Sequence, residues 1–187
     1  MKKPVKTFLK IGGIIIVLAA VVVFIMRYST KAHSPEATVN YTQGDLKIEV
    51  FYNRPYKKER VIFGELVPYN EVWRTGANEA TTFETNKDIM VDGSLLEAGK
   101  YTLWTIPMED SWKVIFNKNM YPWGIDMEEK AYRDPKFDAL VLEVPTKDLQ
   151  RTIEQFTIAF NEENEFINLN LAWAETLVSV PIKPEKA

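Results

Sequence analysis

The chain has 187 residues, of which 46% are hydrophobic and 12% aromatic, a composition typical of a folded protein and unlike disordered or collagen-like chains. It contains no cysteine, which excludes disulfides, thiolate metal sites, a cysteine nucleophile and a lipidated cysteine anchor. The first 32 residues hold six basic and no acidic side chains, which leaves 17 basic and 26 acidic residues in the remainder. An acidic domain of this kind argues against nucleic acid or anionic lipid as its main partner.

The N-terminal segment is long and apolar enough to cross a membrane. Residues 11–26 carry no charge, and Phe8 and Leu9 extend the apolar stretch past Lys10. The resulting span of roughly 17 to 20 residues is short but sufficient for a transmembrane helix. We therefore expect a basic cytoplasmic tail over residues 1–10 and a transmembrane anchor over residues 11–27.

A cleaved signal peptide is the alternative interpretation of this segment. Such a peptide has a small-x-small cleavage site directly after its apolar region. Here the apolar run ends in large residues at positions 24–28, and the nearest alternative site, residues 30–32, has lysine in its middle. We favour an uncleaved anchor. Because four lysines precede the span and two basic residues follow it, the positive-inside rule predicts a cytoplasmic N-terminus and an extracytoplasmic, periplasmic domain.

Residues 28–36 are polar, and we expect them to form a linker before a domain over residues 37–184. The linker contains the only histidine of the chain, His33, which we interpret as a solvated residue because catalysis requires a positioned group. Histidine-dependent triads and histidine-rich metal sites are therefore not expected.

After the linker, apolar residues alternate with polar ones, the pattern of half-buried β-strands. The alternating sets fall within residues 46–52, 112–116, 140–144, 156–160, 167–173 and 178–182. Turn signals lie between several of them, at residues 44–45, 92–93, 98–99 and 161–164. With about ten short strands and little helical periodicity, the sequence predicts an antiparallel β-sandwich of jelly-roll or immunoglobulin-like kind.

Two stretches interrupt the strand pattern, residues 53–70 and residues 117–135, and both are rich in aromatic and charged residues. Long ordered loops on a β scaffold are where functional sites usually lie. Residues 73–82, with the sequence WRTGANEATT, follow the first of them and combine an indole, a guanidinium, a carboxamide and a carboxylate. Such a stretch is either a binding site or a buried polar clamp.

These motifs resemble a known family. The residues that carry the resemblance are Arg54-Pro55, Lys58, Arg60, Ile62-Phe63-Gly64, Leu66-Val67-Pro68-Tyr69, Trp73 to Thr81, Gly93, Ala98-Gly99-Lys100-Tyr101, Ile106-Pro107, Trp112, Phe116-Asn117 and Trp123-Gly124. Together they are similar to the family called domain of unknown function 2911, over roughly residues 34–160. The resemblance implies a secreted or membrane-anchored bacterial protein and carries no established activity.

The candidate ligand-binding residues combine cations with polar and aromatic groups. They are Arg54, Lys58, Arg60, Trp73, Arg74, Asn78 and Glu79. In an acidic domain, four neighbouring cations can form a positive site for a carboxylate, phosphate, sulfate or uronic acid. In the structural alternative, Arg74 pairs with Glu79 or Glu65, and Trp73 fills the sandwich.

An enzyme would need an acid–base pair or a nucleophile. Possible carboxylates are Glu79, Glu84, Asp126, Glu128 and Asp138. A glycosidase-type pair needs two of them in one cleft, which spacing along the chain does not show. No nucleophile elbow, zinc-protease motif or phosphate-binding loop is present, and we expect no metal and no cofactor. The sequence favours an envelope module that binds an anionic or carbohydrate ligand. A carboxylate-based glycan hydrolase and a scaffold for another envelope protein remain the alternatives.

Overall fold

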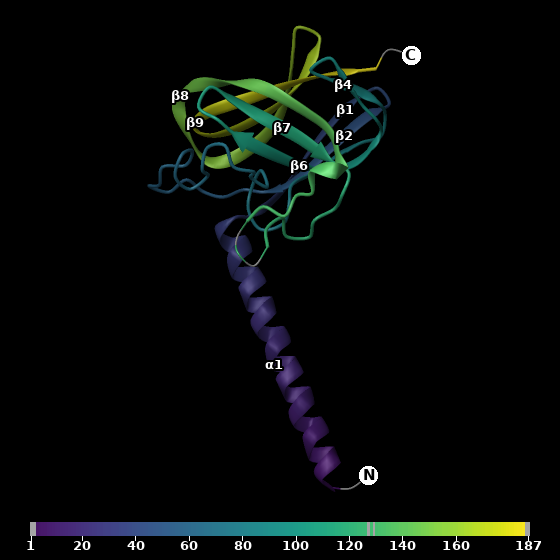
Figure 1. The fold of residues 1–187 in the computed structure, drawn as a ribbon, viewed down its shortest axis with the longest axis vertical. Helices are drawn as coiled ribbons and strands as arrows, with labels where there is room; N and C mark the ends of the chain where they lie inside the picture. The colour runs from purple at the N-terminus through teal and green to yellow at the C-terminus, as the bar shows by residue number, and fades with distance from the viewer. Residues whose placement is uncertain (1–2, 127, 129, 186–187) are drawn as a thin grey trace. The chain divides into compact units, whose positions relative to one another are not determined.

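The structure is a computed structural model that describes residues 3–126, 128 and 130–185 (Figure 1). The chain forms two compact units, Met1–His33 and Ser34–Ala187, which are treated separately below. The first unit is a helix, and the second is a domain built mainly of antiparallel β-strands.

The helix α1 comprises Lys3–His33, and its stretch Lys10–His33 is long and apolar enough to cross a membrane. None of the span is buried against protein, which fits either a membrane anchor or a signal sequence. The helix includes residues 28–33, which we had expected to lie in the linker. No glycine or proline interrupts this part, and Lys31 and His33 suit the negative end of the helix dipole. Pro35 then disfavours helical backbone at Ser34, and the first strand begins one residue later.

Within the described residues, nine strands form the domain, and each paired strand runs antiparallel to its neighbour. They are β1 (Glu36–Gln43), β2 (Leu46–Asn53), β3 (Thr82–Thr85), β4 (Ile89–Val91), β5 (Ser94–Leu96), β6 (Gly99–Pro107), β7 (Ser111–Asn117), β8 (Asp138–Glu163) and β9 (Phe166–Pro184). A single-turn 3-10 helix, η1 (Pro135–Phe137), precedes β8. The strand order is β1-β2-β3-β6-β7-β8-β9-β4-β5, so the sheet is open at β1 and β5.

The long strand β8 belongs to both layers of the fold. Its residues 138–145 pair with β7, whereas residues 146–163 pair with β9. The alternation within residues 140–144 and 156–160 predicted two strands, but the structure joins them because the polar residues between contain no turn and stay unburied. Strand β9 likewise joins two predicted strands through Ala174, whose φ is +52°. The result is the predicted antiparallel β-sandwich-like domain (Figure 1).

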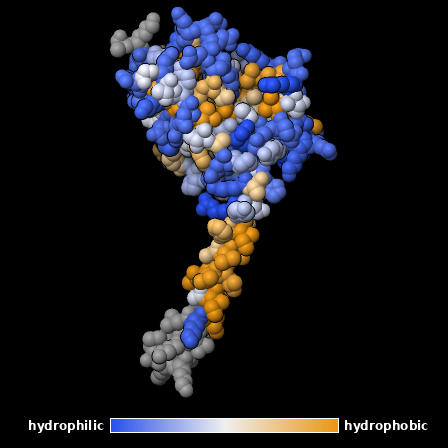
Figure 2. Space-filling model, turned by 180° about the vertical axis from the view of Figure 1, so that it is seen from behind, coloured by the Kyte–Doolittle hydropathy of each residue, from blue (hydrophilic) through white to orange (hydrophobic). Residues whose placement is uncertain are grey.

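The main core lies between the layers and is made by the inward residues of the alternating strands. Val50, Phe83, Leu103, Phe116 and Leu171 are all fully buried. Most of the face of the domain seen in Figure 2 is hydrophilic, with apolar areas among the polar ones, whereas the side chains along α1 are hydrophobic. Hydrophobic burial of this kind supplies most of the driving force for folding.

A second, smaller cluster lies on the opposite face of β6. It contains Ala80, Trp104, Ile115 and Tyr121, all buried. Because residues on a strand alternate between faces, Leu103 enters the main core while Trp104 enters this outer cluster. The irregular stretch of residues 118–134 supplies Tyr121 and Ala131, so this loop covers the outer face of β6 and β7.

Candidate functional site

The WRTGANEATT motif, residues 73–82, lies beside β6 and continues the line of β3 along that strand. Trp73 N donates to Thr105 O at 2.7 Å, and Thr105 N donates back to Trp73 O at 3.0 Å. Leu103 N donates to Thr81 O at 2.8 Å. Between these two anchored points, residues 74–80 leave the sheet and form a compact excursion.

The indole of Trp73 packs against four other aromatic rings of the core. It stacks on Trp173 with ring centroids 5.9 Å apart and meets the rings of Phe63, Trp112 and Phe156 at steep angles. Its Nε1 donates to Gly76 O at 3.0 Å, so the one polar atom of the ring is also satisfied. Edge-to-face and stacked pairs of this kind add roughly 0.5 to 1.5 kcal/mol each beyond burial. Trp73 thus fixes the motif to the core.

The centre of the excursion has an unusual backbone. Thr75 is fully buried and has a φ of +56°, a conformation that β-branched residues rarely adopt. Its hydroxyl lies 3.1 Å from that of Thr105, and its carbonyl accepts a bond from Thr81 Oγ1 at 2.6 Å. A Cβ added at Gly76 would lie 2.9 Å from Asn53 O, so only glycine fits there without displacement. The surrounding contacts hold the strained turn in place.

Four residues form what we call the junction network: Ser34, Asn53, Asn78 and Glu79. Asn78 Nδ2 donates to Ser34 O at 3.2 Å and to Asn53 Oδ1 at 3.3 Å. Asn53 Nδ2 donates to Glu79 Oε2 at 3.1 Å, and Asn53 is completely buried. Asn78 has a φ of +55°, which asparagine tolerates better than most residues. The network therefore holds Ser34, the first residue of the domain, through a hydrogen bond to its carbonyl.

The cations proposed from sequence make contacts in different places. Arg54 donates through Nε to Phe156 O at 3.2 Å and through Nη2 to Thr157 Oγ1 at 3.0 Å, both on β8. Arg60 donates to the carbonyls of Lys57 and Tyr56 and so closes its own loop. Lys58 is exposed, and its backbone N donates to Glu154 Oε1 at 2.8 Å.

Arg74 lies beside the loop that covers the outer cluster. Its Nη1 donates to Trp123 O at 3.4 Å, and its Cβ and Cδ pack against Gly124. Arg54 and Arg60 thus contact β8 and the 56–60 loop, while Arg74 contacts residues 123–124. Asn78 and Glu79 come together through Asn53.

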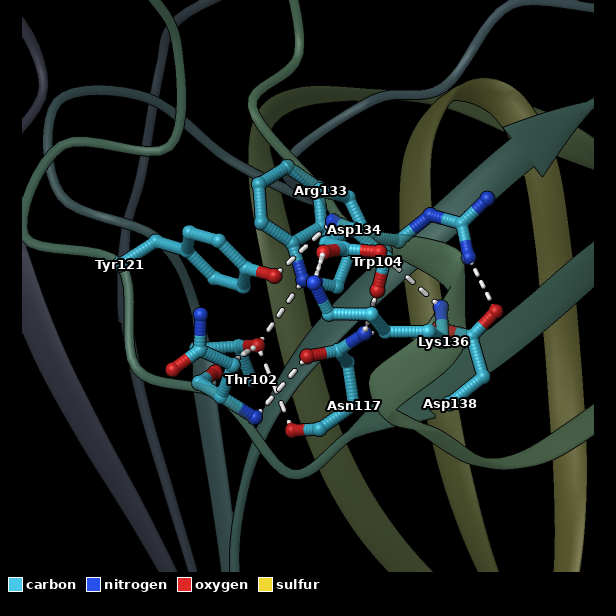
Figure 3. Close-up of polar contacts among 9 residues, drawn as sticks. Thr102, Trp104, Asn117, Tyr121, Arg133, Asp134, Lys136 and Asp138 are labelled. Atoms are coloured by element: carbon cyan, nitrogen blue, oxygen red, sulfur yellow. Dashed lines mark hydrogen bonds and ion pairs between the residues drawn. The ribbon is translucent and has the colours of Figure 1, made fainter.

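A second polar network, which sequence reasoning did not single out, holds the end of the covering loop (Figure 3). Asn117 Nδ2 donates to Asp134 O at 2.9 Å and to Asp138 Oδ1 at 2.8 Å. Asp138 also pairs with Arg133, and both side chains are largely buried. Tyr121 OH accepts a bond from Asp134 N at 2.9 Å (Figure 3). In the sequence, the network could have been recognised from the polar residues near both ends of the long irregular segment.

One carboxylate of this second network has a perturbed acidity. A hydrogen bond from the Lys136 ammonium, at 2.7 Å, lowers the pKa of Asp134 below its ordinary value. Asp134 also caps η1 by accepting a bond from Lys136 N. Both side chains are exposed to a large extent, so we interpret the shift as a surface ion pair that fixes a turn.

The carboxylates considered for catalysis occupy separate environments. Glu79 accepts from Asn53, Glu84 pairs with Lys100 at 2.9 Å, and Asp126 accepts from Glu128 N and Lys130 N. Asp138 belongs to the network of Figure 3. Within the part of the chain that the structure describes, no group of three His, Cys, Asp or Glu residues is arranged to hold a metal ion.

Comparison with known proteins gives one result. A family model described as "Protein of unknown function (DUF2911)" matches residues 34–182, which is most of the β-domain. No curated protein and no solved structure matches the chain.

Proposed function

The chain belongs to the DUF2911 family, whose description names no activity, and we propose that it is a membrane-anchored scaffold of the bacterial cell envelope. In this proposal α1 crosses the membrane with its N-terminus in the cytoplasm. The β-domain faces the extracytoplasmic side and acts through contacts with a protein partner, without catalysis.

The anchor is supported by the exposed apolar surface of α1. The helix spans 31 residues, a length of roughly 46 Å, which exceeds the hydrocarbon thickness of a bilayer. Its apolar side chains have no protein to pack against, because none of the stretch Lys10–His33 is buried. The lysines before residue 11 favour a cytoplasmic N-terminus.

The scaffold is supported by one observation above all, the junction network. The side-chain amides of Asn53 and Asn78 form hydrogen bonds with each other, with Glu79 and with Ser34. Buried amides that are satisfied in this way are suited to hold a fold in place. The motif therefore fits the role of a clamp that holds the first residue of the domain.

A second candidate keeps the original interpretation that this region binds an anionic or carbohydrate ligand. It is supported by the exposed side chains of Lys58 and Arg60, which lie close in sequence to Arg54. Two exposed cations in an acidic domain give a local positive potential.

Two measurements test these proposals. Carbonate extraction and protease accessibility of the full chain in its native membrane should leave α1 in the membrane and expose the domain on the extracytoplasmic face only. Release by carbonate would contradict the anchor. Thermal-shift screening of the full chain in detergent against anionic metabolites and envelope glycans then separates the two candidates. The scaffold predicts no ligand-induced rise in Tm, whereas a rise that disappears in Lys58→Ala would favour ligand binding.

A further inference from the structure

We propose that one exposed loop of the domain rests on the lipid bilayer that holds α1. The surface consists of Tyr56, Lys57, Lys58, Arg60, Val61 and Leu66, and we call it the loop surface. The inference rests on the proposed membrane anchoring and adds a second membrane contact, made by the β-domain itself.

The loop surface presents large apolar side chains to solvent. Tyr56, Val61 and Leu66 are 38%, 54% and 44% exposed. Val61 and Leu66 lie close together, because Leu66 N donates to Val61 O at 3.4 Å. Exposed apolar residues that gather on a domain mark a surface that another phase or molecule covers. Their neighbours in sequence, Ile62 and Val67, are buried in the main core, so the apolar residues outside are additional to those that the fold needs.

The loop that carries these residues is held in a defined conformation. Val67 N donates to Ile62 O at 2.8 Å, and Gly64 N donates to Val67 O at 2.9 Å. Gly64 has a φ of +92°, and a Cβ there would meet the ring of Tyr69 at 2.9 Å. Phe63 packs on Trp112 with centroids 4.8 Å apart. Val61 and Leu66 are therefore presented by a fixed loop, and docking needs little ordering of the chain.

Basic residues accompany the apolar ones. Residues 56–66 hold three basic and two acidic side chains, whereas the chain after residue 32 holds 17 basic and 26 acidic ones. Basic side chains beside aromatic and aliphatic ones are typical of segments that lie in the membrane interface, where the cations meet lipid phosphates. The loop surface thus carries a net positive charge, which suits contact with lipid phosphates, whereas the domain as a whole is negatively charged.

The position of the loop surface favours the bilayer over other partners. Arg54 N donates to Pro35 O at 2.9 Å, so the backbone two residues before Tyr56 is bonded to the start of the domain. The apolar run of α1 ends at Met26, and seven helical residues, roughly 10 Å, complete α1. The tether therefore raises the effective concentration of the loop surface at the bilayer, which offsets the repulsion expected from the acidic domain.

The opposite end of the domain offers a matched control. Leu95 on β5 is 49% exposed, similar to Val61 and Leu66. Residues 86–96 adjoin the β1–β2 turn, because Asn86 bonds to Lys47 N at 2.7 Å and to Asp45 O at 2.8 Å. This turn is separated from Ser34 by the length of β1, roughly 25 Å. Leu95 is equally apolar and exposed, but the proposal places it away from the bilayer.

Because the chain lacks cysteine, single-cysteine variants of the full chain can carry an environment-sensitive fluorophore at one position each. We would label Val61→Cys, Leu66→Cys, Leu95→Cys and, in α1, Leu18→Cys. The variants would be reconstituted into phosphatidylcholine/phosphatidylglycerol vesicles with and without brominated lipids. We expect strong quenching at position 18, quenching by at least half at positions 61 and 66, and little at position 95.

The four positions separate the possible failures. Suppose that position 18 is quenched but positions 61 and 66 are quenched no more than position 95. This result would overturn the loop contact and leave the anchor intact. No quenching at position 18 would overturn both. A Lys57→Gln, Lys58→Gln variant should weaken the quenching at position 61, and added salt should do the same in the unaltered chain. Circular dichroism and Tm of each variant check that the domain is folded.

Discussion

The two ends of the β-domain are stabilised by different kinds of contact. At the end that begins with Ser34, irregular backbone is held by the buried side chains of the junction network. At the other end, short turns join paired strands, and the added contacts are hydrogen bonds of the exposed Asn86 side chain and exposed ion pairs. Lys87 meets Asp45 at 3.5 Å and Lys100 meets Glu84 at 2.9 Å.

The difference follows from where backbone polar groups find partners. In a tight hairpin, the strands satisfy nearly all of them, so the turn needs little from side chains. In the long crossing from Asn53 to Thr82 few strands are available, and buried amides and hydroxyls take their place. Removing a side chain should therefore matter much more at the Ser34 end than at the hairpin end.

The largest effect is expected for Asn53→Ala. The substitution removes the bonds to the buried Asn78 amide and to the half-buried Glu79 carboxylate. We expect the free energy of unfolding to fall by about 2 to 4 kcal/mol. Urea denaturation of the full chain in detergent measures it. The matched control is Asn86→Ala at the hairpin end, which should lose about 1 kcal/mol. Equal losses for the two variants would contradict the comparison.

A backbone substitution gives the next largest effect. Gly76→Ala places a Cβ 2.9 Å from Asn53 O, in backbone that L residues rarely adopt. We expect a loss of about 2 kcal/mol in the free energy of unfolding. Gly44 in the β1–β2 turn also has a positive φ but has open space around it, so Gly44→Ala should cost about 1 kcal/mol. A smaller loss for Gly76→Ala than for Gly44→Ala would show that the excursion adapts easily.

A more local effect is expected for Asn78→Gly. Glycine keeps the positive φ but removes the bonds to Ser34 O and Asn53 Oδ1, so the change isolates the side chain. The free energy of unfolding should fall by about 1 kcal/mol. Hydrogen exchange at the start of β1 should accelerate, because the first residue of the domain is no longer held. Unchanged exchange there would argue that the junction is fixed by the pairing of Pro35 with Arg54 alone.

The smallest effect belongs to the hairpin end. Lys87→Ala removes an ion pair in which Asp45 is 90% exposed. The free energy of unfolding should change by less than about 0.5 kcal/mol, because solvent screens such pairs. Thermal melts at low and high salt would measure this change. A loss comparable with that of Asn78→Gly would remove the distinction between the two ends.

Sequence alone predicted the regular parts of the domain well. The period-two alternation identified β2 and β7, whose inward residues Ile48, Val50 and Val114 are all buried. It divided β8 and β9 into shorter strands, because a strand that passes between layers loses its buried face for several residues. The helix proved longer than the apolar segment, since Arg27, Lys31 and Ala32 favour helix and no glycine or proline interrupts its last residues.

The arrangement of the motif was less predictable. The composition of residues 73–82 predicted either a binding site or a clamp, and the partners of these side chains lie far away in the chain. Asn78 meets Ser34 and Asn53, which lie 44 and 25 residues away in the chain. Periodicity and local propensity report on neighbours within a few residues, so contacts across such distances carry no local signal. The roles of all seven candidate ligand-binding residues stay predictions: Arg54, Lys58, Arg60, Trp73, Arg74, Asn78 and Glu79.

The placement of β8 in both layers also has a consequence for how the protein is made. Tyr52 OH bonds to Ile158 O and accepts from Ile158 N, across a separation of 106 residues. Such high contact order slows folding, because long loops must close before the contacts form. Neither layer is complete until β8 has emerged, so a chain synthesised from its N-terminus stays unfolded until most of it exists. Under the proposed extracytoplasmic placement, we expect this delay to keep the domain unfolded while it crosses the membrane.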